Sequence, residues 1–241
     1  MGEEVLLPPL HVLAKIVRDG KVTPGITARK SVLLYTDISG FTALTEALTA
    51  TGKEGIEEVT GILNAHFDRL GWILKGHKGI LFKLGGDSLL ASFSGLDAVD
   101  RATDSAWKML DWFKEHPEVK TSKGEFSLSM KAILGGGEYF EAILGDDEKR
   151  DWFPLGEVVE ELARVEKSTE PGEFIIKQSL KDELFLSEPY PVIHETELAE
   201  IRELVSSFSP LGRKARVAPS RGGEYRVVAS LFLNVEGYNP R

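Results

Sequence analysis

The hydrophobic positions along this chain change their spacing several times, which predicts strands alternating with helices. Residues 31–36 read SVLLYT, an apolar run typical of a buried strand. From Leu44 to Ile73 the apolar residues recur at intervals of roughly three and four, with an interruption near Gly52. We therefore expect two helices that pack against one face of the core.

The middle of the chain returns to the spacing of strands. Residues 79–93, GILFKLGGDSLLASF, predict two strands around a glycine turn, and a helix is expected over 98–113. Residues 126–134, FSLSMKAIL, alternate strictly, which predicts a strand with one buried face. The glycines at 135–137 predict a hairpin turn into a further strand, EYFEAIL, at 138–144.

A last helix is expected over residues 157–167, followed by a strand at 173–177. The predicted order is β-α-α-β-β-α-β-β-α-β. Hairpins mixed with helices are typical of an α+β fold in which helices pack on a mainly antiparallel sheet.

Composition narrows the class of protein. A chain of 241 residues favours one domain with appendages. It has no cysteine, and its net charge of -9 argues against a nucleic-acid partner or an anionic membrane surface. No apolar run approaches the roughly 20 residues of a membrane span. Residues 1–10 have acids and prolines where a signal peptide would have a basic start, so we expect a cytoplasmic protein without a membrane span.

Two aspartates are the candidate metal ligands. Asp37 ends the first predicted strand, and Asp87 lies in the turn of the 79–93 hairpin. A hairpin beside the first strand would bring the two carboxylates together, and carboxylate and carbonyl oxygens are the ligands that Mg²⁺ accepts. The alternative from spacing alone is that Asp37 caps the following helix and Asp87 is an ordinary turn residue.

Several segments together resemble a known family. LLYTDISGFTALTE and ILFKLGGDSLLASF, followed by KRDWFPLGEVVEELARVE and GEFIIKQSL, are similar in kind and order to class III nucleotidyl cyclases over about residues 31–180. Within this family, DISGFTALTE, ILNAH and the leader HVLAKIV look most like the first catalytic half of the bicarbonate-responsive soluble adenylyl cyclases. The resemblance implies a ferredoxin-like α+β cyclase domain.

The resemblance also implies roles for the residues of the first two motifs. Asp37 and Asp87, with the backbone carbonyl of Ile38, would hold two Mg²⁺ ions, or Mn²⁺ in their place. The substrate would be ATP, which is converted to cyclic AMP and pyrophosphate. The backbone that would wrap its triphosphate comprises Ile38, Ser39, Gly40, Phe41 and Thr42.

The residues that would bind the nucleoside are only partly those of the family. Lys83 falls where adenylyl cyclases have the lysine that reads adenine, and Arg164 falls where an arginine contacts the phosphates in the transition state. Each has a simpler alternative as an exposed surface residue. Phe153 replaces a polar residue that reads the purine, so discrimination there would be on the order of 100-fold or less. Glu160 replaces the asparagine that positions the ribose.

This asymmetry indicates the metal-bearing half of a two-domain site. In the family, one domain supplies the metal carboxylates and a second cyclase domain supplies the nucleoside-binding residues. That second domain would lie C-terminal to this chain or belong to a homodimer or heterodimer. The alternative is an inactive cyclase-like regulatory module that binds a partner and a small anion, such as bicarbonate, through Lys83 and Arg164.

The predicted domain limits follow from these matches. Residues 1–30 form a leader, 31–187 the cyclase domain, and 188–223 a linker with an amphipathic helix. Residues 224–241 contain ASLFLNVEGYN, which repeats the pattern of VLLYTDISGFT. That segment is either the first strand of a second cyclase domain or a strand that docks on the first.

Overall fold

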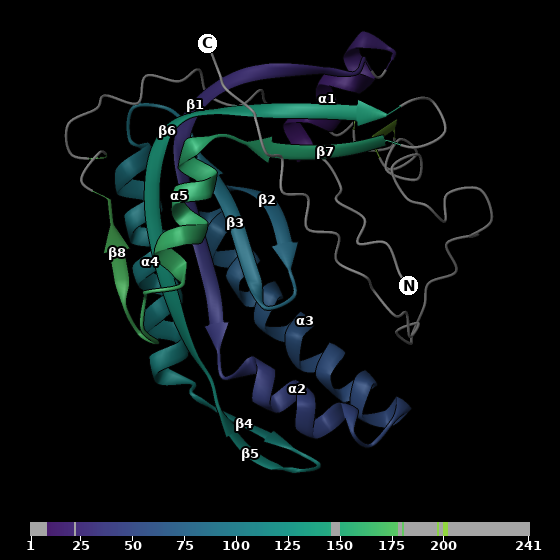
Figure 1. The fold of residues 1–241 in the computed structure, drawn as a ribbon, viewed down its shortest axis with the longest axis vertical. Coiled ribbons are helices and arrows are strands. Elements are labelled where there is room, and N and C mark those ends of the chain that lie inside the picture. Colours follow the sequence, from purple (N-terminus) through teal and green to yellow (C-terminus); the bar gives the residue numbers. More distant parts are fainter. Residues whose placement is uncertain are drawn as a thin grey trace.

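The structure is a computed structural model that describes residues 9–21, 23–145 and 150–177, together with residues 180, 197, 200 and 201. Its sheet has the order β2-β3-β1-β6-β7, and β8 pairs with β6 beside this path (Figure 1). The elements are α1 (Leu10–Asp19), β1 (Gly25–Ser39), α2 (Phe41–Thr49), α3 (Lys53–Gly76), β2 (Ile80–Gly85), β3 (Ser88–Phe93), α4 (Ala98–Glu115), β4 (Glu118–Thr121), β5 (Gly124–Ser127), β6 (Ser129–Gly145), β7 (Arg150–Leu155), α5 (Glu157–Glu166) and β8 (Phe174–Ile176).

The predicted α+β class is confirmed. β1 pairs antiparallel with β3 and β6, and β2 and β7 extend the sheet in the same manner. The pairing of β8 with β6 is parallel. The two helices expected around Gly52, the 79–93 hairpin and the helices beginning at Ala98 and Glu157 all form.

The central strand β1 is covered on both faces. Val32 and Leu34 belong to one core cluster with residues of α2, α3 and α4. Leu33, between them, belongs to a second cluster with Ile16 of α1 and Leu162 of α5. Burial of both faces requires a continuous apolar run, which is what residues 32–34 provide.

The predicted hairpin turn at Gly135–Gly137 is wrong. β6 continues through these glycines to Gly145, and Gly135 pairs with Leu33 of β1. A Cβ added at Gly135 would lie 3.1 Å from a methyl group of Leu162 in α5. Gly135 thus allows α5 to approach the strand closely, and close approach of a neighbouring element is a common reason for a glycine within a strand.

The ends of the chain are described in part. α1 and the beginning of β1 lie within the range 1–30 that the sequence predicts as a leader. The predictions for 188–223 and 224–241 lie outside the described residues, apart from Glu197, Glu200 and Ile201. Ile201 is buried in the second core cluster, and Glu197 pairs with Arg18 of α1. Among the described helices, none is long and apolar enough to cross a membrane.

Candidate metal and nucleotide site

The pairing of β1 with β3 brings Asp37 and Asp87 to one place. Asp37 lies opposite Ser88, the first residue of β3, and Asp87 lies in the turn just before it. The backbone N–H of Ile38 donates a hydrogen bond of 3.1 Å to the carbonyl oxygen of Asp87. The structure therefore brings these two sequence-predicted residues together.

Asp37 points to the face of the sheet opposite its neighbour Ile38. The Ile38 side chain is buried in the core cluster beneath α2, α3 and α4. Because side chains alternate along a strand, Asp37 shares the other face with Tyr35 and Leu33. Its side chain is 19% exposed, so water reaches the carboxylate only in part.

Both carboxylates are in an environment that disfavours their charge. Burial and, after it, the charge of the nearby Asp87 carboxylate together raise the pKa of Asp37 to about 6, against the opposing effect of Lys131. Burial also raises the pKa of Asp87, and the charge of Glu166 adds to this increase. Two half-buried carboxylates with raised pKa values favour a bound cation, and their oxygens are the donors that Mg²⁺ or Mn²⁺ prefers. The donor chemistry of the two carboxylates therefore fits the predicted metal, while no group of three or more histidine or acidic side chains in the described part of the chain is arranged to hold an ion.

Two further charged residues belong to this site, and the sequence interpretation missed both. Lys131 on β6 lies opposite Asp37, and its Nζ is 3.6 Å from Asp37 Oδ2 and 2.5 Å from Glu166 Oε1. Glu166 is the last residue of α5. The alternation of residues 126–134 could have drawn attention to Lys131, because it places this lysine on the face opposite Met130 and Ala132. No local pattern indicated Glu166.

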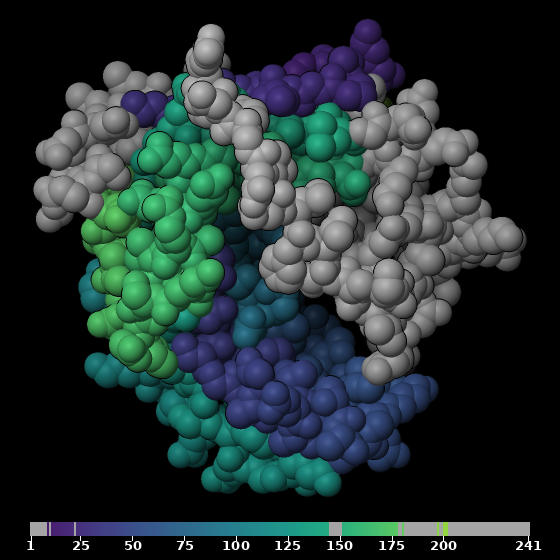
Figure 2. Space-filling model, viewed as in Figure 1, coloured from purple at the N-terminus to yellow at the C-terminus, as the bar shows by residue number. Residues whose placement is uncertain are grey.

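The connection from β1 to α2 requires a glycine. Gly40 has φ +91°, and a Cβ there would lie 2.7 Å from the carbonyl oxygen of Ser127. α2 begins at the next residue, Phe41, so the first N–H groups of that helix lack intrahelical acceptors. Helix N-termini of this kind favour phosphate. Figure 2 shows the surface hollowed between α5 and α2, and the sheet lies at the bottom of the hollow.

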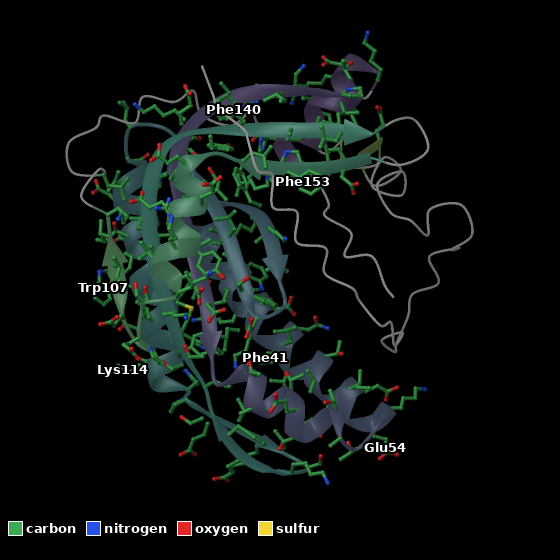
Figure 3. All side chains as sticks on the ribbon, in the orientation of Figure 1. Phe41, Glu54, Trp107, Lys114, Phe140 and Phe153 are labelled. Atoms are coloured by element: carbon green, nitrogen blue, oxygen red, sulfur yellow. The ribbon has the colours of Figure 1, made fainter. Side chains whose placement is uncertain are left out.

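The remaining predicted residues are spread over other elements. Lys83 is half-buried on β2, where it pairs with Leu90, a member of the second core cluster. Glu160 and Arg164 are exposed one turn apart on α5. Phe153 lies on β7, and Figure 3 shows it well away from Phe41 at the start of α2. The geometry thus separates Phe153 from the start of α2.

Comparison with known proteins identifies the architecture. The sequence matches no protein-family profile and no curated protein. Solved structures do match, among them the catalytic core of a rhodopsin-guanylyl cyclase with converted specificity in complex with ATPalphaS. That structure is 24% identical, with 65% of this chain and 82% of that chain covered and a TM-score of 0.51. The chain has the class III cyclase catalytic fold.

Two further matches support this assignment of the cyclase fold. The guanylate cyclase domain of RhGC from Catenaria anguillulae, in complex with GTP, is 23% identical over 64% of this chain and 81% of that chain, with a TM-score of 0.52. The monomeric guanylyl cyclase domain of the RhoGC fusion protein from Blastocladiella emersonii is 23% identical over 65% of this chain and 85% of that chain, with a TM-score of 0.50. The resemblance of the sequence to class III cyclases is confirmed at the level of the fold. The bicarbonate-responsive subtype receives no support from these matches.

Replacement of Asp37 by asparagine in the metal-free cyclase fold should stabilise the protein at neutral pH. The folded-state pKa of about 6 exceeds the ordinary value of 3.8, so the folded state binds this proton more tightly than the unfolded state. Wild-type stability then falls as pH rises from about 4 to about 6, by roughly 1–3 kcal/mol. We expect the free energy of unfolding of Asp37→Asn to exceed that of the wild type by this amount at pH 7.5. At pH 4 the two free energies should differ little. Urea unfolding with a chelator present measures both, and equal stabilities at pH 7.5 would contradict the raised pKa.

Proposed function

We propose that this chain is the metal-bearing half of a class III adenylyl cyclase, which binds Mg²⁺ and ATP and forms cyclic AMP and pyrophosphate together with a second cyclase domain. The observation that supports this most is the convergence of Asp37 and Asp87 beside the N-terminus of α2. A cation site next to a phosphate site suits a metal–triphosphate substrate.

In this proposal the chain supplies the half of the site that holds the charged part of the substrate. Asp37, Asp87 and the Ile38 carbonyl would hold the ions, which would lower the pKa of the ribose 3′-hydroxyl and stabilise the departing pyrophosphate. Backbone N–H groups from Gly40 to Thr42 would bind the triphosphate. The 3′-oxygen would bond to the α-phosphorus, the bond from that phosphorus to pyrophosphate would break, and the hydroxyl proton would pass to solvent water.

ATP is proposed over GTP because of Lys83. By the resemblance to adenylyl cyclases, Lys83 occupies the position of the lysine that reads adenine. This residue is half-buried on β2 and pairs with Leu90 of β3. Mn²⁺ is proposed as a working substitute for Mg²⁺, since both accept carboxylate and carbonyl oxygens.

A regulatory module is the second candidate. Exposed Glu160 stands where the resemblance expects a ribose-positioning asparagine, and a carboxylate there would repel a triphosphate. In such a module Lys83 and Arg164 would bind a small anion at the incomplete interface, and bicarbonate is the proposed anion. The partner would again be a second cyclase domain.

Turnover of ATP and GTP with Mg²⁺ or Mn²⁺, measured with a second cyclase domain added, separates these candidates. We expect cyclic AMP from the wild type and a shift of at least tenfold in the ATP-to-GTP ratio towards GTP for Lys83→Glu, because a carboxylate reverses the polarity read by the purine edge. Lys120→Met on the exposed β4–β5 hairpin is the control and should leave the ratio unchanged. If the chain and the second domain together convert neither ATP nor GTP, the regulatory module would be favoured. Unchanged basal turnover with lost bicarbonate stimulation would assign Lys83 to the anion site.

A further inference from the structure

Lys131 is a partly buried cation within the carboxylate cluster, and the proposed reaction gives it no role. Its side chain is 14% exposed. We propose that Lys131 is the resident counter-ion of the metal site: its ammonium neutralises Asp37 when no metal is bound, and a divalent ion displaces it from Asp37 towards Glu166. This inference rests on the proposed metal site at Asp37 and Asp87.

The distances show which of its two contacts Lys131 keeps. Its Nζ is 2.5 Å from Glu166 Oε1 and also donates a hydrogen bond of 3.2 Å to the Glu166 carbonyl oxygen. The separation from Asp37 Oδ2 is 3.6 Å, which is a looser ion pair. Loss of the Asp37 contact therefore leaves the ammonium with a carboxylate and a carbonyl. Because Glu166 ends α5, that carbonyl lies at the helix terminus that attracts cations.

The charges explain why a counter-ion is needed here. The negative charge of Glu166 raises the pKa of both Asp37 and Asp87, while the positive charge of Lys131 lowers both. Without Lys131, three carboxylates would share one half-buried cleft. With it, two negative charges remain, which is the charge that one divalent ion neutralises. The charges of Lys131 and Glu166 therefore cancel each other, and the negative charges of Asp37 and Asp87 remain to bind the proposed metal ion.

A competing cation weakens metal binding, so its removal should strengthen it. Mn²⁺ binding to the whole chain without nucleotide, measured by calorimetry at pH 7.5, is the test. We expect Lys131→Met to bind Mn²⁺ at least about tenfold more tightly, as follows from removing a unit charge a few ångströms from the ion. Glu166→Gln should bind several-fold more weakly, because Lys131 then has Asp37 as its main partner. The double variant should lie close to the wild type, since the two charges cancel each other.

Controls distinguish the failure of this inference from failure of the metal site. Lys131→Arg keeps the charge and should keep wild-type affinity, and Lys120→Met removes an exposed lysine far out on the β4–β5 hairpin and should change nothing. If the wild type binds Mn²⁺ through Asp37 but Lys131→Met binds no more tightly, while its circular dichroism is native, the counter-ion role is overturned and the metal site stands. If Asp37→Ala leaves Mn²⁺ binding unaltered, the metal site and the counter-ion role both fall.

Discussion

In the proposed two-domain enzyme, we expect replacement of Asp37 by alanine to lower cyclic AMP formation on the order of 1,000-fold or more. The carboxylate lies beside Asp87 on the face of the sheet that the proposed metal occupies. Its loss removes a metal ligand, and metal ions contribute several kcal/mol to the stabilisation of transition-state charge in such displacements. At about 1.4 kcal/mol for each factor of ten, a loss of 1,000-fold corresponds to about 4 kcal/mol.

The measurement is the initial rate of cyclic AMP formation at saturating ATP and Mg²⁺ with the second domain in excess. Asp87→Ala should give a similar loss, because both carboxylates belong to one site. Asp104→Ala, on the exposed side of α4, is the matched control and should retain full activity. Activity of Asp37→Ala within tenfold of the wild type would exclude Asp37 as a ligand of the catalytic metal.

The isolated chain should be nearly inactive, and addition of the second cyclase domain should raise its rate at least 100-fold. In a homodimer, the aspartates of one copy would face Phe153 and Glu160 of the other. Without an asparagine to position the ribose, a misplacement of about 1 Å costs on the order of 100-fold. Glu160 adds repulsion, which is about 4 kcal/mol for two unit charges 4 Å apart at an effective dielectric constant of 20.

Glu160→Asn in the isolated chain tests whether Glu160 makes the nucleoside-binding half of the proposed site defective. Because Glu160 is exposed on α5, the substitution should leave the fold intact. We expect it to raise the residual rate of the chain alone, whereas Glu157→Gln, on the same first turn, should not. Substantial turnover by the unaltered chain that Glu160→Asn does not increase would show that the nucleoside half of the site is sound.

The raised pKa of Asp37 links these activities to pH. Below about pH 6 the carboxylate is protonated in the metal-free site, and metal then has to displace a proton. Lys131 should also weaken metal binding, because its ammonium forms an ion pair with Asp37 in the metal-free structure. In the proposed metal site, a proton, the Lys131 ammonium and the metal ion would thus compete for the Asp37 carboxylate.

The sequence by itself determined the local elements and the first half of the site. The apolar run before Asp37 required a buried strand, and the helix period after Gly40 required a helix whose N-terminus meets that strand. The hairpin pattern of residues 79–93 was enough to predict Asp87 beside Asp37, because a two-stranded unit needs a neighbouring strand to bury its apolar face. These inferences depend on spacings within short segments.

Only the tertiary structure decided the features that depend on contacts between distant segments. Gly135–Gly137 has the composition of a turn, but the approach of α5 makes it part of a long strand. Lys131 and Glu166 are ordinary charged residues in the sequence. Their ion pair at Asp37 exists because β6 lies opposite β1 and the end of α5 lies over both. Register and helix packing are set by the whole core, and no local pattern encodes them.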